Sequence, residues 1–335
     1  MVQDRVEMST VYGPVPSWRF GRSLGIDAIV GTKICTFNCI YCQLGKTAIH
    51  VASPEGLRNP VTAEKVRDDL KSYLAKIDLD SIDVITFSGS GEPTLNLQLG
   101  KMVEHARELS RKKLPIVLHT NASLLHRNDV KKNVSRFDVV CAKLDAGDEQ
   151  SFKIINRPVK EAASFGRVVR SIKELKANLT GKLMTQTMFL RTTSGFSNCE
   201  GPPLESVVDT ISKIDPDVVQ IDTPYRPSAE KFVRHADIDE LSNIADKFQK
   251  NFSKTRLWIF GIHDMRGKRV TWRERESVKE DVLKLLQRRP CRAVDIADSL
   301  DLSYREAAQA VSELLDKKLL SEKKSDGDKY FSSFR

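Results

Sequence analysis

The chain has 335 residues, of which 40% are hydrophobic and 30% charged, and its formal net charge is +9. This composition is typical of a soluble globular protein, and the length allows one large domain and a smaller one. No apolar run approaches the roughly 18 residues that span a bilayer, and the N-terminus lacks the apolar core of a secretory signal. The sequence therefore predicts a cytoplasmic protein without a membrane partner.

The positive charge is unevenly spread along the chain. Residues 273–335 contain 14 Lys and Arg and 13 Asp and Glu, so nearly all of the excess lies on residues 1–272. Any added attraction for a polyanion is therefore expected on the larger, N-terminal part. The alternative is a basic surface that serves solubility alone.

Residues 1–26 are predicted to form an N-terminal arm. The stretch 11–26 mixes glycine and proline with Trp18, Arg19 and Arg22, which argues against regular structure. Such an arm either packs over the mouth of the following domain or places Arg19 or Arg22 near a loop at 35–42 that contains three cysteines, here called the cysteine loop. A short strand is expected from Ile26 to Ile34, where that loop begins.

Three cysteines, Cys35, Cys39 and Cys42, lie within eight residues and are separated by three and then two residues. Three thiolates from one loop can hold three irons of a [4Fe–4S] cluster. The fourth iron then has no protein ligand in this loop and is open to a small molecule. The alternatives are buried or disulfide-bonded cysteines, or a zinc site, which more often shows paired Cys-x2-Cys units or nearby histidines.

After the loop, strand-like and helix-like patterns alternate. Strands are predicted near 83–88, 115–120, 137–144, 182–190, 217–222 and 257–260, and helices near 66–74, 97–111, 160–178, 204–214 and 237–251. Strands separated by helices form βαβ units and a parallel sheet. Six such units are predicted, too few for a full eightfold barrel.

Several predicted strands carry polar residues on one face. Because side chains alternate along a strand, these residues are candidates for the interior of the barrel, where they bind a ligand or pair with one another. They are Thr86, Ser88 and Ser90, His119 and Asn121, Cys141, Lys143 and Asp145, and Gln220 and Asp222. Lys143 and Asp145 are weak catalytic candidates or a structural ion pair. Cys141 is a third weak candidate, as a hydrogen-atom relay.

The last part of the chain changes character. Residues 263–275 are charged and are predicted to be a linker. Helices are expected from Val278, over 293–300 and after Ser303, a candidate N-cap, followed by a hairpin over 319–333. Three helices and a hairpin resemble the winged-helix module, assigned to 276–335. Its near-zero charge leaves nucleic-acid docking, protein docking and a lid over the substrate all open.

The cysteine loop, with Tyr41 before its last cysteine, resembles that of the radical S-adenosylmethionine (SAM) superfamily. The turn at Gly91 and Glu92, after the second strand, is similar to the glycine-glutamate motif of that superfamily. The resemblance covers roughly 27–262 and implies an α/β fold, a partial (βα)6 barrel with its chemistry at the carboxyl ends of the strands. It also implies that the three cysteines ligate the cluster.

The resemblance further implies a set of SAM-binding residues. Tyr41 would flank the adenine, and Gly91 and Glu92 would hold the methionyl amino group. Asn121, Lys143 and Gln220, which are polar residues of the strands, are added as cofactor-binding candidates.

A closer likeness lies in the flanks of the loop, at 13–25 and 42–45. These stretches resemble an Fe–S oxidoreductase group related to the wyosine-base tRNA synthetases, the 4-demethylwyosine synthases. Those synthetases use an additional N-terminal cluster with its own cysteines. Residues 1–34 contain no cysteine, so the wyosine reaction itself is not expected.

The expected function is that of a radical SAM enzyme with two cofactors, a [4Fe–4S] cluster and S-adenosylmethionine. Reductive cleavage of SAM would give a 5′-deoxyadenosyl radical that abstracts hydrogen from a macromolecular substrate, with RNA as the candidate. Reduced ferredoxin or flavodoxin is the expected electron donor. Two alternatives stay open at this point: an activase that installs a radical on a partner protein, and a cluster-sensing regulator that binds DNA.

Overall fold

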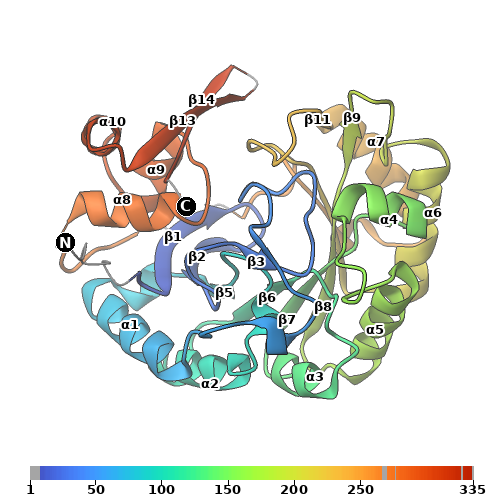
Figure 1. The fold of residues 1–335 in the computed structure, drawn as a ribbon, viewed down its shortest axis with the longest axis horizontal. Helices are drawn as coiled ribbons and strands as arrows, with labels where there is room; N and C mark the ends of the chain where they lie inside the picture. The colour runs from blue at the N-terminus through green and yellow to red at the C-terminus, as the bar shows by residue number, and fades with distance from the viewer. Residues whose placement is uncertain (1–7, 266–269, 276, 326, 334–335) are drawn as a thin grey trace.

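The computed structural model describes residues 8–265, 270–275, 277–325 and 327–333. At its centre is an eight-stranded sheet in the order β1-β2-β5-β6-β7-β8-β10-β12. β1 and β2 are antiparallel, and the other neighbours in the sheet are parallel. The strands are β1 (Val11–Ser17), β2 (Gly21–Ile26), β5 (Val84–Phe87), β6 (Ile116–Thr120), β7 (Val139–Lys143), β8 (Lys182–Met188), β10 (Val218–Asp222) and β12 (Leu257–Ile259). Figure 1 shows the sheet curving into a half-barrel with helices around its outer face.

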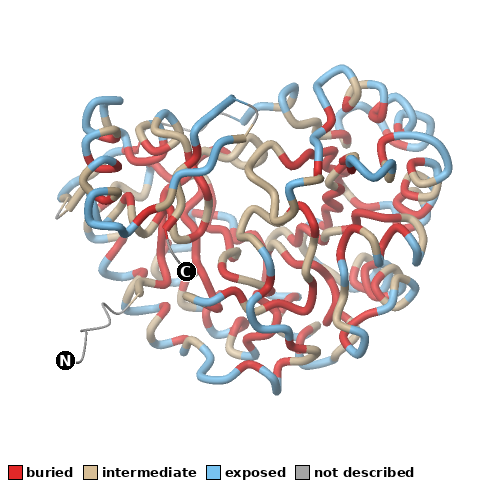
Figure 2. Tube along the Cα trace, turned by 45° about the horizontal axis from the view of Figure 1, so that its top comes forward, coloured by how far each residue is buried: buried red, intermediate tan, exposed pale blue. Residues whose placement is uncertain are grey.

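The outer helices join successive parallel strands. They are α1 (Ala63–Lys76), α2 (Leu99–Leu109), α3 (Asn128–Val134), α4 (Glu149–Asn156), α5 (Phe165–Asn178), α6 (Gly201–Ile214) and α7 (Ile238–Phe248). Side-chain caps fix several starts: the Thr62 hydroxyl accepts from the Lys65 N–H, and Asp237 and Glu240 form a capping box. Figure 2 shows the strands buried and the outer faces of the helices exposed. Burial of one helical face against the sheet holds these layers together.

Short elements complete the half-barrel. β3 (Ile34–Cys35) pairs with β4 (Ile49–His50), and β9 (Leu190–Thr192) pairs with β11 (Val233–His235). Four single 3₁₀ turns are η1 (Pro54–Gly56), η2 (Leu79–Ser81), η3 (Pro93–Leu95) and η4 (Lys254–Arg256). None of the helices in the described ranges is long and apolar enough to cross a membrane.

The predicted alternation of strands and helices is confirmed after residue 62, except that two helices and the short strand β11 were not predicted. α3 and α4, of seven and eight residues, were not predicted, because so few turns give little helical periodicity. The helix predicted from residue 160 begins five residues later, at Phe165. The six predicted βαβ units correspond to the six connections between the seven parallel strands of the sheet.

The prediction of irregular structure for residues 11–26 is wrong. These residues form β1 and β2, a hairpin that makes one edge of the main sheet. The strand expected from Ile26 to Ile34 is also wrong, because β2 ends at Ile26 and only Ile34 and Cys35 form the short β3. The glycines and prolines of this stretch fit a strand at the edge of a sheet, where a bulge between Tyr12 and Val15 interrupts the pairing.

Residues 277–333, here called the C-terminal module, contain three helices and a hairpin in the predicted order. They are α8 (Val278–Leu286), α9 (Ala293–Leu300), α10 (Tyr304–Asp316), β13 (Leu320–Ser325) and β14 (Asp328–Ser333). Ser303 caps α10, as predicted, in a capping box with Glu306. The assignment to the winged-helix family and the domain bounds stay predictions. The predicted linker packs on the half-barrel, since Arg273 N–H donates to the Lys76 carbonyl.

The C-terminal module shares its core with the main sheet. Tyr12 and Val15 of β1 lie in one apolar cluster with α8, α9 and α10. A buried ion pair crosses the same boundary: Arg288 Nε lies 3.3 Å from Asp27 Oδ2, and both side chains are almost fully buried. Arg22 makes a second link, to Asp298 at 2.8 Å. Arg22 therefore points to the module and not toward the cysteine loop.

Substitution of Arg288 by Met tests the buried pair. It leaves the Asp27 carboxylate buried without its cation, so we expect the free energy of unfolding to fall by about 3 kcal/mol. Lys213→Met removes the cation of an exposed pair with Asp209 and should cost about 0.5 kcal/mol or less. Chemical denaturation measures both, and equal losses in the two variants would contradict the assigned importance of Arg288.

Candidate active site

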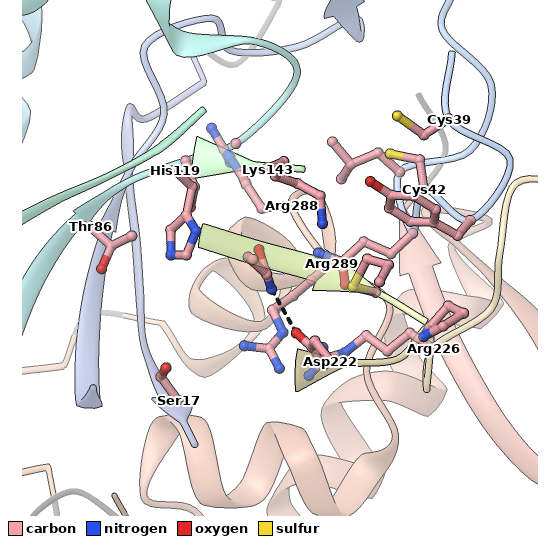
Figure 3. Close-up of a pocket in the computed structure, with 18 of the residues that line it drawn as sticks. Ser17, Cys39, Cys42, Thr86, His119, Lys143, Asp222, Arg226, Arg288 and Arg289 are labelled. Carbon is pink, nitrogen blue, oxygen red and sulfur yellow. Dashed lines mark hydrogen bonds between the residues drawn. The ribbon is translucent and has the colours of Figure 1, made fainter. Parts of the chain in front are cut away.

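A cavity of about 320 Å³ lies where the parallel strands end. Its wall includes residues that follow β5, β6 and β10, residues of the cysteine loop and of the β1–β2 hairpin, and two arginines of the C-terminal module. Figure 3 shows Cys39, Cys42, His119 and Lys143 among the side chains that line it. The volume is in the range of small-molecule sites, and the position is the one that βα folds use for chemistry.

All three cysteines of the loop line this cavity. All six cysteines of the chain are free thiols, so the disulfide alternative is not realised. The loop is held by backbone hydrogen bonds to the end of α4, from Asn38 N–H to the Asn156 carbonyl at 3.0 Å and from Ile40 N–H to the Ile155 carbonyl at 2.9 Å. Within the described ranges, no three His, Cys, Asp or Glu side chains are gathered closely enough to hold one metal ion.

Two thiols receive amide donors from other elements. Asn121 Nδ2 lies 3.6 Å from Cys35 Sγ, and Asn156 Nδ2 lies 3.5 Å from Cys39 Sγ. Burial raises the pKa of both thiols, that of Cys39 to about 11, with Asp145 and Cys42 adding to the shift at Cys39. A negative charge on these sulfurs therefore needs a compensating cation, which a bound metal provides.

The turn at Gly91 is fastened directly to the start of the cysteine loop. Ile34 N–H donates to the Ser90 carbonyl at 3.0 Å, and Glu92 N–H donates to the Ile34 carbonyl at 3.2 Å. Gly91 has φ +152°, and a Cβ there would lie 1.7 Å from the Ile34 carbonyl oxygen. Only glycine allows this approach, so the two predicted motifs are one structural unit.

Glu92 is buried, and its carboxylate is already hydrogen-bonded within the chain. One oxygen accepts from Thr94 N–H at 3.1 Å and from the Thr94 and Thr120 hydroxyls at 2.7 Å, and the other accepts from Asn121 N–H at 2.7 Å. Burial raises the pKa of this carboxyl, and these hydrogen bonds oppose the shift. Glu92 thus ties the turn to β6 and to Asn121, besides lining the cavity.

Tyr41, Lys143 and Asp145 form one group. The Tyr41 hydroxyl donates to Asp145 Oδ2 at 2.5 Å, and Lys143 Nζ lies 3.4 Å from Asp145 Oδ1 and 4.9 Å from the centre of the Tyr41 ring. Tyr41 and Lys143 line the cavity, whereas Asp145 lies behind them and also accepts from Asn156 and the Met188 backbone. The structural ion pair considered from the sequence is thus present.

Four of the predicted residues lie outside the cavity. Cys141 and Gln220 are fully buried next to Met184, with Gln220 Nε2 3.2 Å from the Met184 sulfur and 3.8 Å from Cys141 Sγ. Neither is among the described residues that line the cavity, and Ser90 and Asp145 are not either. The structure therefore places Gln220, a predicted cofactor-binding residue, outside this cavity, because its side chain ends next to Cys141 and Met184. Thr86, Ser88, His119, Asn121, Lys143 and Asp222 line the cavity as expected.

Arg19, one of the two arginines considered for a place near the cysteine loop, lies in the cavity wall, and three other arginines there were missed from the sequence. Asp222 accepts from Arg19 at 3.0 Å and from Gln186 at 2.6 Å, and this pairing brings Arg19 into the wall. Arg226, Arg288 and Arg289 also line the cavity. No local pattern marks the last three, since they come from a loop after β10 and from the C-terminal module. Burial, with Arg19 and Lys143 nearby, lowers the pKa of His119 well below its usual value.

Comparison with known proteins places this geometry in context. Residues 29–193 match the model of the radical SAM superfamily. The chain is 30% identical over 296 residues to the UPF0026 protein MJ1312 of Methanocaldococcus jannaschii, covering 88% of this chain and 87% of that protein. It is 38% identical over 217 residues to the UPF0026 protein slr1464 of Synechocystis, covering 65% and 76%. Its fold resembles that of Streptococcus suis SuiB bound to precursor peptide SuiA, with a TM-score of 0.52, 13% identity, and coverage of 73% of this chain and 50% of SuiB.

The close approach at Gly91 can be tested with two alanine variants that should act in opposite directions. Gly91→Ala places a Cβ against the Ile34 carbonyl, and we expect the free energy of unfolding to fall by about 2–4 kcal/mol. Gly166 in α5 has no atom within 4 Å of an added Cβ, so Gly166→Ala should stabilise by about 0.5 kcal/mol. Denaturation curves measure both changes, and an unchanged Gly91→Ala protein would refute the role given to the turn.

Proposed function

The chain belongs to the UPF0026 family and is a radical SAM superfamily enzyme. We propose that its cavity binds a [4Fe–4S] cluster and S-adenosylmethionine. We further propose that the enzyme modifies a macromolecule, with RNA as the candidate. The observation that carries the proposal is the joining of two motifs at one cavity. Three thiols of one loop line it, and the Gly91–Glu92 turn is hydrogen-bonded to the residue before the first of them.

The chemistry of the donor set fits such a cluster. Cys35, Cys39 and Cys42 would be its ligands, and the amides of Asn121 and Asn156 would donate to the sulfurs, as is usual around iron–sulfur centres. The three thiols share the cavity wall without being gathered on one point, which suits a cluster better than a single metal ion, because each thiolate would bind a different iron. One iron would have no ligand from the loop and would be open to S-adenosylmethionine.

The wall of the cavity offers distinct places for the parts of S-adenosylmethionine. The turn at Gly91 and Glu92 would receive the methionyl amino group, Tyr41 would flank the adenine, and Asn121 and Lys143 would supply polar contacts. Gln220 is not part of this proposal because it lies outside the cavity. When bound, the cluster and S-adenosylmethionine supply reductive cleavage to a 5′-deoxyadenosyl radical, which abstracts hydrogen from the substrate.

The chain itself orients these groups and limits solvent. The Asp145 carboxylate fixes the hydroxyl of Tyr41, the ammonium of Lys143 and the amide of Asn156, and Asn156 in turn reaches Cys39. The β1–β2 hairpin and two arginines of the C-terminal module add to the wall of the cavity, and so reduce the water in contact with whatever it binds.

The macromolecular substrate is proposed on two grounds. The C-terminal module resembles a winged helix, and the flanks of the cysteine loop resemble proteins related to the wyosine-base tRNA synthetases. Reduced ferredoxin or flavodoxin is the proposed electron donor. The substrate class and the electron donor are proposed from resemblance to other proteins, whereas the cofactors are proposed from the geometry of the cavity.

The cofactor assignment predicts the products of an anaerobic reaction. Wild-type protein reconstituted with iron and sulfide should hold about four irons per chain and, with dithionite and S-adenosylmethionine, release 5′-deoxyadenosine and methionine. Cys35→Ala, Cys39→Ala and Cys42→Ala should each lose this activity by at least about a hundredfold, because the remaining thiols hold the cluster poorly. Iron analysis, absorbance and chromatography measure these outcomes.

Cys199→Ala is the matched control, because Cys199 is a buried free thiol outside the loop and outside this cavity. It should retain cluster and cleavage. Full turnover by Cys141→Ala would exclude the relay role considered for that residue. A wild-type protein that keeps its cluster, binds DNA according to cluster state and yields no 5′-deoxyadenosine would favour the regulator over the enzyme.

A further inference from the structure

We propose that Arg226 and Arg289 form an anion subsite in the cavity wall that receives a phosphate group of the substrate. The inference deepens the proposed function and rests on it, since it takes this cavity as the place where substrate is bound. It assigns the substrate a chemical class, a phosphate-bearing molecule. It also gives the C-terminal module a direct part in recognition.

The first step is the charge balance of the cavity. Five cationic side chains line it, and three of them have a carboxylate partner: Arg19 with Asp222, Lys143 with Asp145, and Arg288 with Asp27. Within the described part of the chain, Arg226 and Arg289 form no ion pair, and the Nε of each is buried without a hydrogen-bond acceptor. A partly buried guanidinium with an unused donor is costly unless a ligand supplies the acceptor.

The second step is that Arg226 is held in place. Its Nη1 donates to the Tyr225 hydroxyl at 2.5 Å, and its guanidinium lies 4.3 Å from the centre of the Tyr225 ring. That ring stacks on Phe260 at 4.3 Å, and the Tyr330 hydroxyl of β14 donates to the Tyr225 carbonyl at 3.1 Å. The nearby Asp295 carboxylate is already bound by Arg292.

The third step is that Arg289 is held at the end of α8. Its backbone N–H donates to the Leu285 carbonyl at 3.2 Å, and its neighbour Arg288 is fixed by the buried pair with Asp27. Figure 3 shows Arg226 and Arg289 in the same view of the cavity as Cys39 and Cys42. The Arg226 guanidinium and the Arg289 backbone are thus fixed before a ligand arrives, which lowers the entropy lost on binding.

Phosphate is the anion that best matches this pair. A guanidinium binds phosphate and carboxylate alike by two parallel hydrogen bonds, but a phosphate monoester carries close to two negative charges and presents three oxygens. Two unpaired arginines match that charge, whereas one arginine suffices for a carboxylate. The phosphate can belong to a free phosphorylated molecule or to an RNA backbone, where each phosphodiester carries one negative charge and two neighbouring phosphates would engage the two arginines. The experiment separates these sources.

The test is titration calorimetry on anaerobic, cluster-loaded protein with three probes: inorganic phosphate, a short single-stranded RNA and S-adenosylmethionine. We expect Arg226→Gln and Arg289→Gln each to weaken phosphate binding about tenfold or more, since a charge-assisted hydrogen bond is lost. Arg226→Lys should recover part of the loss. Arg305→Gln, which removes an exposed arginine of α10, should stay within about twofold of wild type.

The RNA probe identifies the source of the phosphate. A parallel loss of RNA binding in the two Gln variants supports an RNA substrate, and loss confined to inorganic phosphate supports a free phosphorylated molecule. The subsite is refuted if wild type binds no phosphate or if both Gln variants bind it like wild type. It is also refuted if these variants lose affinity for S-adenosylmethionine as strongly, because the pair would then hold the carboxylate of the cofactor.

The proposed function is tested separately from the phosphate subsite. If wild-type protein does not cleave S-adenosylmethionine, the enzyme reading is wrong whatever the calorimetry shows. Unfolding curves of each variant accompany the titrations, and native midpoints with lost phosphate binding exclude simple misfolding as the cause.

Discussion

The buried carboxylate of Asp27 is the contact on which the arrangement of the cavity depends. One of its oxygens accepts from Ile29, Val30 and Ser90 N–H, and the other accepts from the Ser90 hydroxyl and from Arg288. Asp27 follows β2, Ser90 precedes the Gly91 turn, and Arg288 belongs to the C-terminal module. A charge this deeply buried is stable only when all these partners are present. It therefore fixes three separate segments relative to one another.

The polar residues of the cavity fall into two groups by what they contact. Glu92 and Asp145 accept several hydrogen bonds from the chain and hold the loop, the turn and the strand ends together. Tyr41, Asn121 and Lys143 are positioned by those carboxylates and still face the open volume. This division is characteristic of preorganised sites, where buried acceptors orient the groups that touch a ligand.

The sequence predicted what is encoded locally. Three cysteines in eight residues and a Gly–Glu turn are short patterns whose chemistry is contained in their spacing. Alternation along β6 and β7 correctly placed Asn121 and Lys143 on the interior face. It did not show how deep a side chain lies: Cys141 of β7 and Gln220 of β10 also face the interior, but they lie outside the cavity, next to Met184. Alternation along a strand predicts which face of the sheet a side chain lies on, but it does not predict at which residue of the strand the cavity begins.

The remaining features depend on contacts between distant parts of the chain. The β1–β2 hairpin looked irregular because Tyr12 and Val15 have their apolar partners in helices near the end of the chain. Arg226 and Arg289 carry no local signal for the same reason. This topology also orders events on the ribosome. Cys42 is translated long before Arg288 and Arg289, so the cysteine loop is synthesised before the last part of the cavity wall exists. The cavity is therefore complete only once the final helices have been made and have docked on the β1–β2 hairpin.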